Sequence, residues 1–366
     1  MSSNKRYKID TKKPVLVTGG TGYVASVLIK QLLDEGVTVH ATVRDPSKTE
    51  RFQYLQDLAD SSKGSIKFFK GDLVEDGSFE DAMKGCEIVF HTASPFTLDP
   101  KADPVKDIVE PAVNGTRNVL NQCTKTPSVK RVVLTSSVGA VHCDISEIYE
   151  TPNKVFDESC WNKGSSLTYQ PYFLSKTLAE QEAWIISGSQ TQWTMAVINP
   201  SLVLGPGVKY HKGSESYSII EAMGRGDFAS GTAEFNVGVV DVRDVARAHI
   251  VAGYDWTVTG RNIVCGSDTG FLEMASTLLK RYPEYPLPTR KIPKLLIYLL
   301  APYIPGTDIK RKYVWNNVGI DLKYDTSKSK RDLGLEYRSL DSTLNDMFQQ
   351  IIDEGVIGQE KAPSKN

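Results

Sequence analysis

The chain has 366 residues, of which 40% are hydrophobic and 24% charged, with 28 Gly and 18 Pro. This composition is typical of a globular protein of roughly two domains and excludes disordered, collagen-like and repeat proteins. Since 43 Lys and Arg oppose 44 Asp and Glu, the formal charge of −1 provides no positive field for phosphates or anionic lipid. We therefore expect neither nucleic acid nor a membrane as a partner.

Five cysteines stand far apart without a Cys-x-x-Cys pair, and the histidines show no ligand spacing, so we expect no disulfide framework and no metal site. The first 13 residues lack the apolar segment of a secretory signal. The most apolar later stretch, residues 295–304, is about half the ~20 residues that cross a bilayer. These features predict a cytoplasmic protein.

Short apolar runs rich in Val and Ile predict eight β-strands, and most of these runs are separated by segments with helical spacing. The predicted strands lie at residues 14–18, 37–43, 66–69, 88–91, 131–135, 194–198, 237–240 and 262–265. Strands that are apolar on both faces and alternate with helices are typical of a parallel sheet covered on both sides. The sequence therefore predicts an α/β fold with a doubly wound (Rossmann) parallel sheet.

The alternation weakens in two stretches that are richer in Gly, Pro and polar residues. We predict a nucleotide-binding domain in which the later strands return to the first sheet, and a smaller substrate-binding lobe that is interleaved with it. The domain would comprise residues 12–204 and about 236–266, the lobe about 205–235 and 267–356, and flexible tails 1–11 and 357–366.

A glycine-rich segment links the first predicted strand to the first predicted helix. Gly19 would permit a tight turn, Gly22 would let the backbone approach a pyrophosphate, and the helix N-terminus offers N–H donors. A glycine cluster alone is also compatible with a structural turn, but between a strand and a helix it favours dinucleotide binding. The predicted binding residues are Gly19, Thr21, Gly22, Tyr23 and Val24.

The residues after the second predicted strand favour NADPH over NAD. NAD-binding domains carry an acidic residue near this point for the ribose hydroxyls. Arg44 is the first charged group here, with Lys48 behind it, and an arginine fork suits the 2′-phosphate of NADP. The alternative is a solvated basic turn in which Asp45 binds the ribose. After the third strand, Asp72 and Leu73 are candidates for contact with adenine.

Two Tyr-x-x-x-Lys pairs are present, and their context distinguishes them. Tyr172 and Lys176 begin a segment of good helix formers, after a strand that leads to Ser137. The i, i+4 spacing puts both side chains on one face, so we expect the ammonium to lower the phenol pKa. Tyr324 and Lys328 lie in a polar run, for which we expect a surface role. In the first pair, Tyr172 would donate a proton, Lys176 would tune it and Ser137 would hydrogen-bond a carbonyl beside a dihydronicotinamide.

With Thr-Gly-x-x-Gly-x-x-Ala at residues 18–25, Ser137 and the Tyr172/Lys176 pair, the chain resembles the extended short-chain dehydrogenase/reductase superfamily over nearly its whole length. Residues 41–46, 156–161 and 172–181 are similar to plant dihydroflavonol 4-reductases. Residues 91–96 and 240–246 resemble yeast ketone and aldehyde reductases of the same group.

The resemblance implies a catalytic triad of Ser137, Tyr172 and Lys176, with Asn114 as a fourth member of a proton relay. It also implies further contacts with the cofactor by Thr92, Ser94, Pro200, Ser201 and Leu202. Substrate identity is less defined, because His142 stands where flavonoid reductases carry an asparagine and the Asn-Trp-Tyr-Cys-Tyr-Gly-Lys signature of cinnamoyl-CoA reductases is absent. The candidate substrate contacts, which could equally be packing residues, are Phe96, His142 and Tyr169.

The sequence thus predicts an NADPH-dependent carbonyl reductase that converts an aldehyde or ketone to an alcohol, as a monomer or homodimer. One alternative is an NAD-dependent nucleotide-sugar epimerase or dehydratase on the same fold. Dehydratases usually carry an acidic pair after the serine strand, where this chain has Val138, Gly139 and Ala140. Another alternative is a non-catalytic NADPH-binding sensor.

Overall fold

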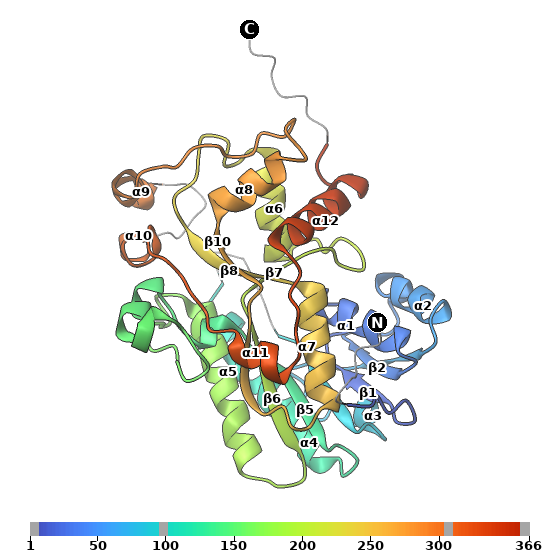
Figure 1. Ribbon diagram of the computed structural model, residues 1–366. Helices are drawn as coiled ribbons and strands as arrows, with labels where there is room; N and C mark the ends of the chain where they lie inside the picture. The colour runs from blue at the N-terminus through green and yellow to red at the C-terminus, as the bar shows by residue number, and fades with distance from the viewer. Residues whose placement is uncertain (1–6, 95–101, 304–309, 359–366) are drawn as a thin grey trace.

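The computed structural model describes residues 7–94, 102–303 and 310–358, and its largest element is a parallel sheet (Figure 1). The seven strands of this sheet follow the order β3-β2-β1-β4-β5-β6-β9, and every neighbouring pair is parallel. The predicted doubly wound α/β fold is confirmed. The strands are β1 (Val15–Val17), β2 (Thr38–Val43), β3 (Ser65–Lys70), β4 (Ile88–His91), β5 (Arg131–Thr135), β6 (Thr194–Pro200) and β9 (Gly260–Val264).

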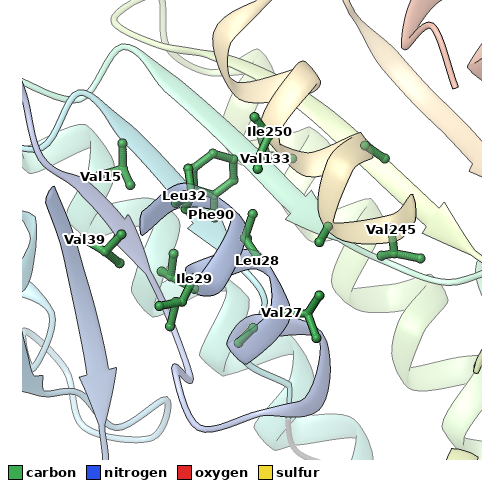
Figure 2. Packing of buried hydrophobic residues seen from close by; sticks show 14 of the residues in the cluster. Val15, Val27, Leu28, Ile29, Leu32, Val39, Phe90, Val133, Val245 and Ile250 are labelled. Carbon is green, nitrogen blue, oxygen red and sulfur yellow. The ribbon is translucent and has the colours of Figure 1, made fainter. Parts of the chain in front are cut away.

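Helices cover both faces of the sheet because successive residues of each strand point to opposite sides. Val15 and Val17 face one core, whereas Leu16 between them belongs to the other. Figure 2 shows the first core, in which strand residues pack against α1 and α7. This face carries α1 (Tyr23–Asp34), α2 (Gln53–Asp60) and α7 (Val242–Tyr254), and the other carries α3 (Glu80–Met83), α4 (Glu110–Lys125) and α5 (Pro171–Gly188).

A three-stranded sheet with the order β10-β8-β7 stands above the large sheet in Figure 1. It pairs β8 parallel to β7 and antiparallel to β10. Together with α6, α8 and α12 it surrounds a separate hydrophobic core, and we call this part the small lobe. Its elements are β7 (Leu202–Leu204), β8 (Asn236–Asp241), β10 (Ser267–Gly270), α6 (Glu215–Arg225), α8 (Phe271–Leu279), α9 (Lys294–Leu300), α10 (Arg311–Asn317) and α12 (Leu340–Asp353).

Only one of the two later strands that we expected in the large sheet belongs to it. We expected the strands around 237–240 and 262–265 both to return, but only β9 does, by pairing with β6, whereas β8 belongs to the small lobe. Apolar residues predict that a segment is a buried strand, but its partner depends on distant parts of the chain. The short strands β7 and β10 were not predicted at all.

Shorter helical segments complete the described chain. They are the π-helical η2 (Pro104–Val109), the 3-10 segments η1 (Thr49–Arg51), η3 (Val138–Ala140), η4 (Ile145–Glu150), η5 (Pro152–Lys154) and η6 (Ala301–Tyr303), and α11 (Ser327–Asp332). Parts of the predicted tails are packed, since Tyr7 and Ile9 contact the large core and Ile357 is buried in the small lobe. Residues 1–6 and 359–366 lie outside the described residues. Within the described ranges, no helix is long and apolar enough to cross a bilayer.

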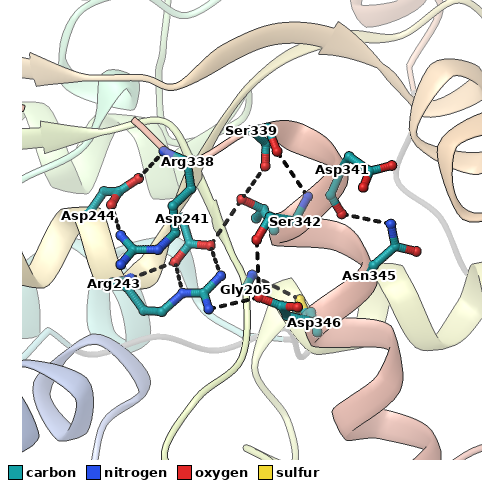
Figure 3. Close-up of polar contacts among 12 residues, drawn as sticks. Gly205, Asp241, Arg243, Asp244, Arg338, Ser339, Asp341, Ser342, Asn345 and Asp346 are labelled. Carbon is teal, nitrogen blue, oxygen red and sulfur yellow. Dashed lines mark hydrogen bonds and ion pairs between the residues drawn. The ribbon is translucent and has the colours of Figure 1, made fainter. Parts of the chain in front are cut away.

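A polar cluster joins α7 to the start of α12 (Figure 3). The buried carboxylate of Asp241 accepts hydrogen bonds from the Arg243 guanidinium at 2.6 and 2.8 Å and from Thr343 Oγ1 at 3.0 Å. Arg243 also pairs with Asp346 of α12 at 2.8 Å. Asp244, also in the first turn of α7, pairs with Arg338. These contacts attach the small lobe to a helix of the large sheet.

Candidate active site

A cavity of about 620 Å³ lies between the carboxyl ends of β5 and β6 and the small lobe. The crevice at the carboxyl ends of the strands is where open α/β sheets bind ligands. Ser137, Tyr172 and Lys176 all line this cavity, and so do Pro200, Ser201 and Leu202. The small lobe contributes Glu215, Phe235, Phe271 and Tyr313 to the opposite wall.

Ser137 is positioned by the turn that follows β5. It is the N-cap of η3, and its Oγ accepts a hydrogen bond from the Gly139 backbone N–H at 3.0 Å. A Cβ at Gly139 would lie 2.9 Å from the Phe173 ring, so this turn and α5 pack too closely for a side chain. The Ser137 hydroxyl thus remains able to donate a hydrogen bond into the cavity.

Tyr172 and Lys176 occupy the first turns of α5. Pro171 at the first position presets the helical φ, and Gln170 before it adopts the left-handed conformation at φ 56°, a strained geometry that is often found at functional sites. The Lys176 Nζ lies 5.8 Å from the centroid of the Tyr172 ring and donates to Ser94 Oγ at 2.9 Å. The predicted pair therefore shares one helix face and meets Ser94.

The pKa of Tyr172 is raised rather than lowered, because burial outweighs the effect predicted for Lys176. Burial raises the pKa of Tyr172 above its usual value, and the nearby carboxylate of Glu215 raises it further. Desolvation of the phenolate dominates because the ring lies in a cavity of low polarity. Burial also lowers the pKa of Lys176 to about 8, against an opposing contribution from Glu180. At neutral pH the phenol thus keeps its proton and Lys176 is mainly an ammonium.

A buried ion pair holds α5 against the sheet. Arg261 Nε donates to Glu180 Oε1 at 2.7 Å, and the Glu180 side chain is fully buried. Ser136 and Asn199 donate to the other carboxylate oxygen at 2.6 and 2.8 Å. The Arg261 guanidinium lies 4.0 Å from the centroid of the Trp161 ring. We did not predict this network, although the spacing of Glu180 four residues after Lys176 was an available signal.

The glycine loop packs closely between β2 and the residues that follow β4. Gly19 has a φ of 67°, which favours glycine, and its N–H donates to Thr42 Oγ1 at 3.0 Å. A Cβ at Gly20 would lie 2.9 Å from the Ala41 Cβ. The N–H groups of the first turn of α1 have no carbonyl partner within the helix, and no acidic side chain lies there. The loop therefore fits the pyrophosphate of a dinucleotide.

Other residues of the predicted loop connect it to its surroundings. Tyr23 donates to the Gly205 carbonyl at 2.5 Å, and Tyr23 and Val24 both line the cavity. Thr21 lies between the two turn glycines. The dinucleotide loop and the candidate catalytic residues are thus parts of one continuous surface.

The turn after β2 keeps Arg44 exposed and engages Asp45. The Asp45 carboxylate accepts from Ser47 Oγ at 2.6 Å and from the Ser47 N–H at 3.1 Å, and it pairs with Lys48 at 3.5 Å. These contacts, led by the Ser47 hydroxyl, lower the pKa of Asp45. Because its carboxylate closes this turn, Asp45 fits ribose binding less well than Arg44 fits a phosphate.

The ends of β3 and β4 lie beside the loop. Thr92 donates to the Thr18 carbonyl at 2.5 Å, which ties β4 to the strand that precedes Gly19. Asp72 accepts from the Val74 N–H at 3.1 Å. Leu73 packs so closely on α4 that a Cβ at Gly115 would lie 2.9 Å from it.

Asn114 is not among the residues that line the cavity, and the relay role implied for it stays a prediction. It is exposed on α4, and its Oδ1 accepts from Arg117 Nη1 at 2.7 Å. Because Gly115 faces Leu73, the preceding position of the helix points to solvent. Phe96, a predicted substrate contact, lies outside the described residues.

His142 and Tyr169 line the cavity, and so does Tyr324, for which the predicted surface role is wrong. The buried Tyr324 hydroxyl is 2.6 Å from His142 Nε2, and burial lowers the pKa of His142 to about 4. Tyr324 forms a β-bridge with Phe156, so it does not share a helix face with Lys328. Lys328 instead donates to Asn262 Oδ1 at 2.9 Å.

One cluster has the residue types of a metal site. Ligand atoms of Cys143, Asp144 and Glu147 lie within 4.8 Å of one another. Asp144 accepts hydrogen bonds from Tyr169 at 2.5 Å and from Asn317 at 2.7 Å, and Glu147 accepts from the N–H of Asp144 at 3.1 Å. The carboxylates of Asp144 and Glu147 therefore make hydrogen bonds that hold the loop of residues 143–147 in place.

Comparison with known proteins identifies the class to which this fold and site belong. The model of the NAD dependent epimerase/dehydratase family matches residues 15–266, and the chain belongs to this family, which is the extended short-chain dehydrogenase/reductase group. The resemblance found in the sequence is confirmed.

Particular relatives are reductases. The chain is 36% identical over 340 residues to a cinnamoyl-CoA reductase of Medicago truncatula, covering 92% of this chain and 95% of the relative. It is 36% identical over 348 residues to tetraketide alpha-pyrone reductase 1 of Arabidopsis thaliana, covering 94% and 97%. The solved yeast methylglyoxal/isovaleraldehyde reductase complexed with NADPH is 28% identical with a TM-score of 0.74, covering 94% of this chain and 100% of that one. The chain is thus an oxidoreductase of its family.

Proposed function

We propose that this protein reduces an aldehyde or ketone to the corresponding alcohol, with NADPH as the reductant. The observation that carries the proposal is the meeting of Ser137, Tyr172 and Lys176 in one cavity next to the glycine loop. The yeast relative solved with NADPH and the plant reductases support it.

The residues around the glycine loop fit NADPH. Gly19 and Gly22 would let the backbone come close to the pyrophosphate, and Arg44 would bind the 2′-phosphate. The position of Arg44 directly after β2 supports this, because Thr42 of β2 accepts a hydrogen bond from the glycine loop. Bound NADPH supplies a hydride from its reduced nicotinamide. Lys176, whose Nζ donates to Ser94 Oγ at 2.9 Å, would hold the ribose next to that ring together with Ser94.

The proton comes from Tyr172. Ser137 donates a hydrogen bond to the carbonyl oxygen of the substrate, and Tyr172 transfers its phenolic proton to that oxygen while the carbonyl carbon accepts the hydride. One hydride and one proton convert the carbonyl to the alcohol and leave NADP⁺ and a phenolate. The ammonium of Lys176 stabilises this phenolate, which regains its proton from solvent.

The test is Tyr172→Phe, which removes the acidic hydroxyl and keeps the ring. We expect NADPH oxidation with a carbonyl panel to fall by at least ~100-fold, because positioned general acids contribute about that much or more. NADPH affinity, followed by fluorescence titration, should change little. Full activity of the variant would refute the assignment. The wild type should oxidise one NADPH for each alcohol molecule formed, whereas an epimerase would regenerate its cofactor.

A further inference from the structure

Glu215 is the single acidic residue among the described residues that line the cavity. It is the first residue of α6, so it belongs to the small lobe, and it lines the same cavity as Tyr172 of α5. The neighbouring wall of the small lobe is neutral, with Ile219, Phe235 and Phe271. The wall that the small lobe contributes to the cavity, which we expect to contact the substrate, therefore contains one carboxylate.

The negative charge of Glu215 influences the phenol of Tyr172, which is the proposed proton donor. Its charge raises the pKa of the Tyr172 phenol, which donates to the substrate oxygen in the proposed reaction, and contributes to raising the pKa of Tyr313 to about 12. Glu215 is an exposed residue that also lines the cavity, and partial desolvation there raises its pKa. Lys176 is the only Lys or Arg among the described residues that line the cavity with Glu215.

The ammonium of Lys176, which also lines the cavity, points toward Ser94 and not toward the small lobe. Lys176 donates to Ser94 Oγ at 2.9 Å and lies beside the Tyr172 ring, on the side of the site that holds the cofactor loop. A substrate carboxylate next to the reacting carbonyl would thus enter the field of Glu215 in a partly desolvated space. Like charges in such a space repel more strongly than in water.

We propose that Glu215 is a specificity-determining residue that restricts this site to uncharged carbonyl compounds by repelling substrates that carry a carboxylate on the reacting carbonyl carbon. This inference rests on the proposed carbonyl reductase function. It assigns the large sheet to the reaction and one carboxylate of the small lobe to the choice of substrate.

The test compares a matched pair of ketones, ethyl 2-oxo-4-phenylbutyrate and the 2-oxo-4-phenylbutyrate anion, which differ mainly in charge. We measure kcat/KM for each with NADPH, and the Ki of the anion against the ester. The wild type should prefer the ester. Glu215→Gln should raise the acid-to-ester ratio of kcat/KM by roughly 10-fold, because it removes a unit negative charge from the wall of a partly desolvated cavity. Glu215→Asp should keep the wild-type preference.

The control is Asp227→Asn, which removes a negative charge just after α6 from an exposed position outside the cavity wall. Its ratio should equal that of the wild type, which separates the local effect from net charge. If Glu215→Gln leaves both the ratio and the Ki unchanged while neutral ketones are reduced, this inference is wrong and the proposed function stands. If no carbonyl compound is reduced by the wild type, the proposed function itself fails.

Discussion

In the large sheet, most strands are followed directly in the chain by a helix that covers them, whereas the small lobe gathers α6, α8 and α12 from three separate stretches. The first part carries Ser137, Tyr172, Lys176 and the glycine loop, and the second covers the cavity with apolar side chains and Glu215. This division means that substitutions in the two parts should affect different measurements. Chemistry and cofactor binding belong to the first, and substrate choice to the second.

The largest effect is expected for Glu180→Gln, which breaks the buried ion pair under α5. Arg261 would remain buried without its partner, so we expect the free energy of unfolding, measured in urea, to fall by about 3–5 kcal/mol. Glu180 raises the pKa of Lys176, which is about 8, so its loss should move the high-pH limb of kcat/KM to lower pH. Glu182→Gln on the same helix breaks only the partly exposed pair with Arg117 and should do neither.

The connection between the two parts can be weakened by Arg243→Met. Asp241 would keep its Thr343 contact but lose the guanidinium, which we expect to cost about 2–4 kcal/mol. Hydrogen exchange should become faster in α12 and β8 than in β1 and β4. Arg247→Met serves as the control, since that arginine lies on the same helix but contacts Glu35 at 3.9 Å and the Tyr7 ring rather than α12. Equal acceleration in both sheets would contradict the division.

For Arg44→Ala we expect a change in the affinity for NADPH and little change in any other property. Loss of hydrogen bonds to a phosphate costs about 1.5–3 kcal/mol, so the KM for NADPH should rise by roughly 10- to 100-fold. The KM for NADH should hardly change. Arg51→Ala, a nearby exposed arginine, is the matched control. A parallel loss with both cofactors would place the 2′-phosphate elsewhere.

The smallest effect is expected for Asn114→Ala. Its side chain is exposed and bonded to Arg117, away from the cavity, so kcat/KM should change by less than about twofold. Steady-state rates with a neutral ketone are sufficient to check this. A large loss of activity would support the relay role that the family resemblance implied.

Features whose signals lie within a short stretch of the chain could be predicted before the structure was known. Apolar runs predicted all seven strands of the large sheet because a strand buried on both faces leaves few polar positions. The glycine loop was predictable because a strand, a tight turn and a helix follow one another within a few residues. Tyr172 and Lys176 were predictable as neighbours because four residues make one helical turn.

Features that depend on segments far apart in the chain became visible only in the folded protein. Folding placed β8 beside β7 and β10, buried Tyr324 against His142, and turned Asn114 to solvent. It also set the charges of the site, because burial rather than Lys176 controls the pKa of Tyr172, and it brought Glu215 to the same cavity as that phenol. Strand pairing, burial and desolvation arise only when distant residues meet, so no local pattern in the chain contains them.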